Sequence, residues 1–140
     1  MRALALWLGL VLALPAVGAE RVTGADAAEI RDVIQRQIDA FRRDDAQGAF
    51  ALASPGVRRV FGTPERFLDV VRMAYRAVYR PVALSFLDMR VMGEDVVQPV
   101  QVTDRAGNLW VAYYAMQRQA DGSWRTSGCH LVPPVRTYPA

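Results

Sequence analysis

Residues 82–132 read VALSFLDMRVMGEDVVQPVQVTDRAGNLWVAYYAMQRQADGSWRTSGCHLV, and this stretch decides the fold. Apolar and polar side chains alternate through most of it, which is typical of β-strands with one buried face. The segments DRAGN at 104–108 and DG at 121–122 have the composition of turns between antiparallel strands. We therefore expect four consecutive antiparallel strands, at residues 82–92, 96–103, 109–119 and 124–132.

The second of these strands contains Pro99, which has no backbone N–H to donate to a neighbouring strand. Pro99 therefore predicts that this strand lies at an edge of the sheet or carries a bulge. Pro133 and Pro134 follow the fourth strand and are expected to close the domain.

Before residue 82 the apolar residues recur with the period of a helix. A first helix is predicted over 26–43, with Asp26 as its cap and Glu29 completing a capping box. Its opposite face is expected to be solvated, with Asp32 paired to Arg36 and Asp39 paired to Arg43. Its buried face is expected to consist of Ile30, Val33, Ile34, Ile38 and Phe41.

Three further helices are predicted ahead of the strands, at residues 46–53, 55–61 and 64–79. Ser54-Pro55 and Thr63-Pro64 each combine a capping hydroxyl with a first-turn proline, and Pro81 ends the last helix. The apolar face of that last helix is expected to consist of Phe67, Val70, Val71, Ala74, Tyr75 and Val78. Helices followed by an antiparallel meander predict an α+β fold, with the N-terminal helices packed on one face of a curved antiparallel sheet.

The N-terminus has the three parts of a secretory signal peptide. Arg2 gives the positive charge, residues 3–14 (ALALWLGLVLAL) are uninterruptedly apolar, and small residues precede Glu20. We expect residues 1–19 to be removed by a Sec-type signal peptidase. The prediction is then a single α+β domain at 20–135 with a loose tail at 136–140, periplasmic or secreted by a bacterium, and with no stable membrane anchor after cleavage.

Composition excludes several classes of chemistry. The formal net charge is only +3 and the arginines are interleaved with acids, so a nucleic-acid partner is not expected. All 17 basic residues are arginine, which excludes a Schiff-base lysine and a Walker-type phosphate loop. With one cysteine and one histidine, the chain predicts no dedicated metal site, no cofactor and no internal disulfide.

Three segments carry a resemblance to known families: IDAFRRDD at 38–45, AFALASP at 49–55 and DGSWR at 121–125. They resemble the cone-shaped α+β fold of nuclear transport factor 2-like proteins, ketosteroid isomerase and polyketide cyclases. Together with Phe61-Gly62 and Gly128-Cys129, they more closely resemble the bacterial domain-of-unknown-function family numbered 4864. The resemblance implies a cavity between the helices and the sheet, and it brings no assigned activity with it.

Catalytic candidates are few. Cys129 and His130 are neighbours on a strand, so their side chains should point to opposite faces and cannot act as a pair. Strict alternation places His130 on the same face as Trp124 and Thr126, and Cys129 with Leu131. Because some proteins with the resembled fold perform acid–base chemistry in their cavity, Asp88 and His130 are the candidate catalytic residues.

Aromatic residues are the candidate ligand-binding groups: Tyr75, Trp110, Tyr114 and Trp124. Arg72, Arg76 and Arg80 form a row along one helix, which fits either a solvated edge or contact with an anionic partner. The sequence therefore predicts a non-catalytic exported module that binds a small apolar ligand or a partner protein. The alternatives are a cofactor-free isomerase or dehydratase that uses the cavity, and an interaction domain that forms a homodimer.

Overall fold

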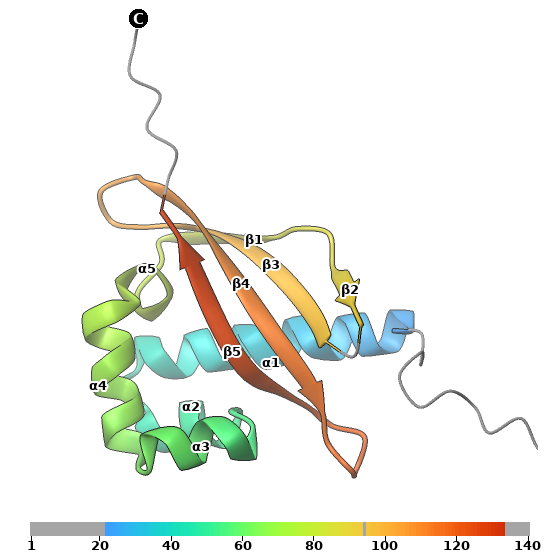
Figure 1. Ribbon diagram of the computed structural model, residues 1–140. Helices are drawn as coiled ribbons and strands as arrows, with labels where there is room; N and C mark the ends of the chain where they lie inside the picture. The colour runs from blue at the N-terminus through green and yellow to red at the C-terminus, as the bar shows by residue number, and fades with distance from the viewer. Residues whose placement is uncertain (1–21, 94, 134–140) are drawn as a thin grey trace, which may run out of the picture.

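The computed structural model describes residues 22–93 and 95–133, which form helices followed by an antiparallel sheet (Figure 1). This arrangement confirms the predicted α+β class. The helices are α1 (Gly24–Arg42), α2 (Ala46–Ala51), α3 (Pro55–Phe61), α4 (Pro64–Ala74) and α5 (Arg76–Tyr79). The strands are β1 (Ala83–Phe86), β2 (Arg90–Met92), β3 (Asp95–Thr103), β4 (Leu109–Arg118) and β5 (Trp124–Val132).

The predicted apolar face of α1 is confirmed, because all five of its residues are buried. The predicted cap is wrong. The N-cap is Thr23, whose hydroxyl accepts from the Asp26 backbone N–H at 3.1 Å while the Asp26 carboxylate accepts from the Thr23 N–H at 2.9 Å. The cap, Thr23, thus lies three residues before the predicted cap, Asp26. Asp26 in turn takes the position in the capping box that was predicted for Glu29.

The ion pair between Asp32 and Arg36 forms on the solvent face of α1, at 3.6 Å. The predicted pair of Asp39 with Arg43 is replaced by contacts of Asp39 with Arg42 and of Arg43 with Asp45. Arg43 is the C-cap of α1, and its side chain pairs with Asp45 beyond the end of the helix instead of with Asp39.

The predicted helix at 64–79 is broken in two at Tyr75, whose φ of −128° and ψ of 45° are not helical. Val70 and Ala74 are exposed, contrary to the expected buried face, whereas Phe67, Val71 and Val78 are buried. The break turns the chain after α4, so that α5 lies against the end of α1 (Figure 1).

The sheet has the order β1–β3–β4–β5, with β2 also paired to β3. The fourth predicted strand, 124–132, coincides with β5. The first predicted strand, 82–92, is instead two short strands that pair with different parts of β3. Contrary to the prediction for Pro99, β3 lies inside the sheet, between β4 and the β1–β2 pair.

The interruption between β1 and β2 explains how an interior strand accommodates Pro99. The Pro99 carbonyl accepts a hydrogen bond from the Leu87 N–H at 3.0 Å. In an antiparallel pair the N–H and C=O of one residue point to the same side, so the N–H that Pro99 lacks would also have pointed toward the interruption. There the Gln98 side-chain amide donates to the Leu87 carbonyl at 2.7 Å and replaces the bond that a backbone N–H would have made.

One face of the sheet, formed by alternate residues of β3 and β4, is buried against α1. The buried residues of that face are Val96, Gln98, Val100, Val102, Ala112, Tyr114 and Met116.

Among residues 22–93 and 95–133, no helix has both the length and the apolarity needed to cross a membrane. The predicted signal peptide and the predicted C-terminal tail lie outside the described residues.

Candidate functional site

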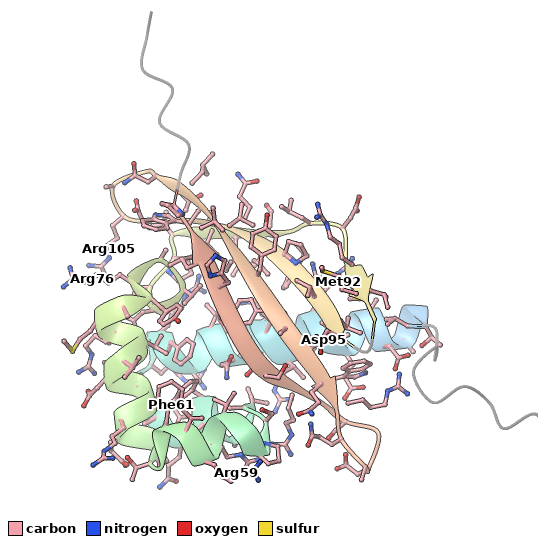
Figure 2. All side chains as sticks on the ribbon, viewed as in Figure 1. Arg59, Phe61, Arg76, Met92, Asp95 and Arg105 are labelled. Carbon is pink, nitrogen blue, oxygen red and sulfur yellow. The ribbon has the colours of Figure 1, made fainter. Side chains whose placement is uncertain are left out.

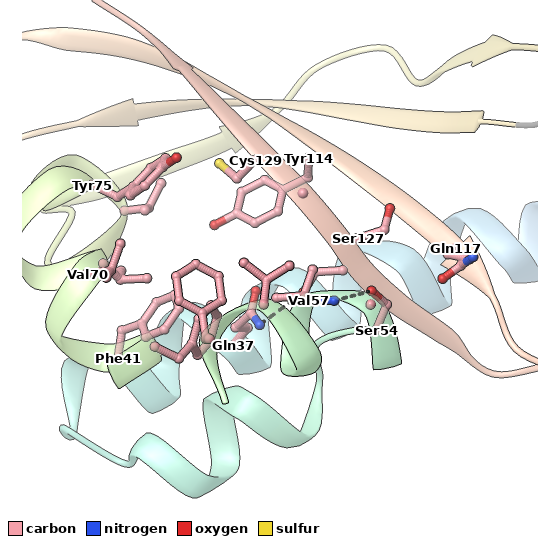
Figure 3. Close-up of a pocket in the computed structure, with 18 residues that line it drawn as sticks. Gln37, Phe41, Ser54, Val57, Val70, Tyr75, Tyr114, Gln117, Ser127 and Cys129 are labelled. Atoms are coloured by element: carbon pink, nitrogen blue, oxygen red, sulfur yellow. Dashed lines mark hydrogen bonds between the residues drawn. The ribbon is translucent and has the colours of Figure 1, made fainter. Parts of the chain in front are cut away.

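A pocket of about 520 Å³ lies between the helices and the last two strands (Figure 3). Hereafter we call it the apolar pocket. Its described lining contains no aspartate, glutamate, arginine or histidine. The largest group among the lining residues is a set of apolar side chains from α1, α3, α4 and α5: Phe41, Val57, Val60, Phe61, Phe67, Val70, Val71 and Val78.

Aromatic packing around Phe67 of α4 forms one wall of the apolar pocket. The Phe67 ring centroid lies 5.7 Å from that of Phe41, 5.7 Å from that of Phe50 and 5.3 Å from that of Phe61. Tilted and edge-to-face ring pairs of this kind add specific packing to the burial of apolar area. The wall therefore joins α1, α2, α3 and α4 through one central ring.

Gln37 provides a polar group within the otherwise apolar face of α1. Its side-chain amide donates to the Ala49 carbonyl at 3.0 Å and to the Thr126 hydroxyl oxygen at 3.1 Å. Gln37 is 2% exposed, so both bonds are made out of contact with bulk water. They fix α1 to α2 and to β5 at the base of the pocket.

A β-bulge in β5 decides which residues of that strand face the pocket. Met116 pairs with Thr126 while Ala115 pairs with Gly128, so Ser127 is the extra residue. Thr126 and Cys129, which strict alternation would separate, both line the pocket. The prediction that His130 shares a face with Trp124 and Thr126 is wrong, because the bulge reverses the alternation and leaves His130 exposed.

The Tyr114 side chain extends from β4 and its hydroxyl points into the pocket (Figure 3). Tyr114 is 2% exposed, and its hydroxyl makes no hydrogen bond of ordinary geometry among the described residues; the Cys129 thiol, a weak hydrogen-bonding group, is close enough to raise the pKa of Tyr114 a little further. Burial raises the pKa of Tyr114 well above 10, so the group stays a neutral donor. An unpaired hydroxyl in such a place costs about 1–3 kcal/mol relative to a satisfied one.

Cys129 faces Tyr114 directly across the β4–β5 pair. It is half-buried where it borders the pocket, and it forms no disulfide among the described residues. Burial raises the pKa of the Cys129 thiol from 9.0 to about 12, so the thiol is protonated at neutral pH. Tyr114 and Cys129 are therefore both uncharged at neutral pH.

Apolar side chains surround the outer part of the pocket. Val60 of α3 is 81% exposed, and Val70 and Met73 of α4 are 37% and 77% exposed. Val60 and Val70 also line the pocket. A cluster of exposed apolar side chains beside an apolar pocket is typical of a site through which an apolar ligand enters.

Residues 23–138 match the family described as domain of unknown function (DUF4864). The chain belongs to this family. No curated protein and no solved structure matches it. The apolar pocket lies wholly within the matched residues, so it is a feature of the DUF4864 domain.

Two of the four predicted ligand-binding residues of the DUF4864 domain, Tyr75 and Tyr114, line the apolar pocket. The two tryptophans do not. Trp110 donates its indole N–H to Asp104 at 2.9 Å, and Trp124 is buried with its indole N–H 3.3 Å from Asp26. Each tryptophan therefore holds elements of the DUF4864 domain together.

The predicted catalytic candidates lie elsewhere on the DUF4864 domain. Asp88 is exposed in the interruption between β1 and β2, and His130 is exposed on the face of β5 opposite Cys129. Neither lines the apolar pocket. Within the described residues there is no group of three or more histidine, cysteine, aspartate or glutamate side chains that could hold a metal ion.

Sequence reasoning missed Gln37 and Thr126 as pocket residues. Gln37 occupies a position of the apolar stripe of α1, one turn after Val33 and one turn before Phe41, and a polar residue at such a position is a detectable signal. Thr126 carries no comparable signal, because alternation places it on the face of Trp124 but does not say which face of the strand is buried.

Proposed function

We propose that the domain binds a small, uncharged and largely apolar molecule in the apolar pocket, where the Tyr114 hydroxyl donates a hydrogen bond to an oxygen of the ligand. The observation that carries this proposal is the buried hydroxyl itself. It points into the pocket and makes no hydrogen bond of ordinary geometry among the described residues, and its neighbour, the Cys129 thiol, is only a weak hydrogen-bonding group. Buried polar groups are almost always hydrogen-bonded, so an unpaired one indicates a missing partner.

The charge of the lining supports an uncharged ligand. A charged molecule would lose its hydration on entering and would meet no counter-charge among the described lining residues. Tyr114 and Cys129 stay protonated because burial raises the pKa of each. A carbonyl, ether or hydroxyl oxygen on an apolar body is the chemistry that fits.

The size and the surroundings of the pocket support a ligand rather than a simple packing defect. Its volume of about 520 Å³ falls within the range of small-molecule sites, which run from about 300 to 1,000 Å³. Val60 and Val70 both line the pocket and are exposed, so an apolar ligand would meet apolar side chains where it enters.

Two finer predictions from the sequence belong to this proposal. We propose that the domain acts in the periplasm or outside the cell after loss of residues 1–19, as the signal-peptide pattern indicates. We also propose that it is a member of the nuclear transport factor 2-like superfamily. Helices that precede an antiparallel sheet and enclose a pocket against it are consistent with that placement.

Native mass spectrometry of the protein purified from the periplasm tests the proposal. We expect a fraction of molecules to carry a neutral organic compound, released on denaturation. Binding of the neutral apolar dye Nile red should be weakened at least about tenfold by Tyr114→Phe. Tyr113→Phe is the matched control, because Tyr113 is the adjacent, half-buried tyrosine outside the pocket. Equal binding by both variants, with no retained compound, would refute the proposal.

A further inference from the structure

A second hollow, of about 570 Å³, lies between α4, α5 and the loop that joins β3 to β4. We call it the arginine hollow. Four arginines line it together with Tyr79, Asp104 and Ala106: Arg72, Arg76, Arg80 and Arg105. It shares no described lining residue with the apolar pocket, so it calls for a separate explanation.

Asp44 positions two of these arginines from outside the hollow. Its carboxylate lies 2.9 Å from the Arg80 guanidinium and 3.5 Å from that of Arg72, and it accepts a short hydrogen bond from the Tyr79 hydroxyl. The two guanidinium groups lie 4.8 and 5.6 Å from the Tyr79 ring centroid. Arg72 and Arg80 are thus held in place before any ligand binds.

The left-handed backbone of Asp44 makes this arrangement possible. Its φ is +52°, and aspartate is one of the few residues other than glycine that adopt this conformation readily. It lies just after Arg43, the C-cap of α1, so the chain turns there and the carboxylate reaches residues 35 and 36 positions later.

The remaining two arginines carry unpaired charge. The guanidinium groups of Arg76 and Arg105 have no ion-pair or hydrogen-bond partner among the described residues, and the two side chains lie at the same border of the molecule (Figure 2). Asp104, the one carboxylate in the described lining, already accepts bonds from the Ala106 and Asn108 N–H groups and from Trp110. It is therefore poorly placed to neutralise either arginine.

We propose that the arginine hollow binds the phosphate group of a polar, phosphate-bearing ligand. Two unpaired guanidinium groups beside two fixed ones supply positive charge and forked N–H donors, which bind the anionic oxygens of a phosphate group. Besides the guanidinium groups and Asp104, the lining consists of the Tyr79 ring, Ala106 and the aliphatic stems of the arginines, against which a ring or alkyl part of the ligand would pack. The phosphate belongs either to a soluble phosphate ester or to a lipid headgroup.

Calorimetry with inorganic phosphate and with glycerol 3-phosphate tests the soluble source. Cosedimentation with phosphatidylglycerol vesicles, against phosphatidylcholine vesicles as blank, tests the lipid source. We expect at least one of these probes to bind, the soluble ones with Kd below about 1 mM. Binding in the calorimetric arm assigns a soluble ester, and binding only to phosphatidylglycerol assigns a headgroup.

The double variant Arg76→Gln/Arg105→Gln should weaken that binding at least tenfold. The control Arg31→Gln/Arg66→Gln removes the same charge from exposed arginines outside the hollow and should change binding less than twofold. Circular dichroism checks that each variant is folded. If the double variant is unfolded, the single variants Arg76→Gln and Arg105→Gln are tested in its place. Absence of binding to every probe, or equal loss in both double variants, would overturn the proposal. Neither result bears on the apolar pocket, which Tyr114→Phe tests separately.

Discussion

The carboxylate of Asp26, in the first turn of α1, accepts a hydrogen bond from the indole N–H of Trp124, the first residue of β5, at 3.3 Å. The same carboxylate lies 2.9 Å from the Arg118 guanidinium at the end of β4. Arg118 in turn lies 4.8 Å above the Trp124 ring. The start of the first helix is therefore fixed to the last hairpin, so residues 98 positions apart in the sequence support each other.

Asp26 should make stability depend on acid pH. The hydrogen bond from the Thr23 N–H is the main cause that lowers the pKa of Asp26 from 3.8 to about 2, with smaller contributions from Trp124 and Arg118. A carboxylate with a lowered folded-state pKa stabilises the fold above its unfolded pKa, and the stabilisation is lost as pH falls from about 4 to about 2. Asp26→Asn should cost about 1 kcal/mol at pH 7, because solvent screens part of the interaction.

Urea unfolding at several pH values between 7 and 2 measures this effect. In the Asp26→Asn variant, the free energy of unfolding should fall less below pH 4 than it does in the unmodified protein. Asp32→Asn, which breaks only an exposed ion pair, is the control and should keep it. An unchanged pH profile in Asp26→Asn would show that these contacts do not stabilise the fold.

Tyr114→Phe should not destabilise the ligand-free protein. Removing a buried hydroxyl that has no partner removes its desolvation cost while keeping the ring, so the free energy of unfolding should rise by about 1 kcal/mol. Tyr113→Phe should change it by less than about 0.5 kcal/mol. Chemical denaturation of the ligand-free protein and of both variants gives the two changes in unfolding free energy. A loss of 1 kcal/mol or more in Tyr114→Phe would mean that the hydroxyl is already bonded.

Cys129 should react slowly with thiol reagents. The thiolate is the reactive form, and a pKa of about 12 leaves very little of it at pH 8. The rate should rise about tenfold for each pH unit above 8, and Nile red should slow it because Cys129 lines the apolar pocket. Labelling kinetics followed by mass spectrometry measure both effects. Rapid labelling at pH 7 would contradict the raised pKa.

Gln37→Leu should destabilise the protein by about 1–3 kcal/mol. The change leaves the Thr126 hydroxyl and the Ala49 carbonyl without the donor that now reaches both. Gln35→Leu is the control on the same helix, since Gln35 is only half-buried and bonds to the exposed side of α1. Thermal unfolding of both variants compares them. Equal effects would indicate that helix propensity, not the buried amide, accounts for the loss.

Export should yield a chain that begins at Glu20. The charge of Arg2, the apolar run at 3–14 and the small residues before Glu20 together predict cleavage there. N-terminal sequencing of protein from the periplasmic fraction checks the prediction. A variant with Ala19→Arg should block cleavage, because the residue before the cut must be small, whereas Ala13→Leu should leave it unchanged. Retention of Met1 on membrane-bound protein would contradict it.

The sequence predicts the fold well where a local signal is strong. Ser54-Pro55 marks the start of α3, and the turn at Asp121-Gly122 together with Pro133 brackets β5. It fails where long-range pairing decides. Pro99 indicates an edge strand, but Gln98 and the interruption between β1 and β2 let it lie inside the sheet.

The candidate site is predictable only in part, for the same reason. Tyr75 and Tyr114 are identifiable as aromatic residues on expected elements, and both line the apolar pocket. The orientation of Cys129 and His130 depends on Ser127, an extra residue that follows no local pattern. Which of two neighbouring side chains faces the pocket is therefore decided by pairing with β4.

The interruption opposite Pro99 also bears on self-association. An unbroken border strand offers a row of free N–H and C=O groups that invites a second chain to add to the sheet. Here that border consists of β1 and β2, of four and three residues, separated by a segment that cannot continue the ladder. The proline within β3 is thus accompanied by resistance to edge-to-edge aggregation at this border, while part of the other border, β5, is covered by the backbone hydrogen bonds of Thr126 with Leu52 and Ser54.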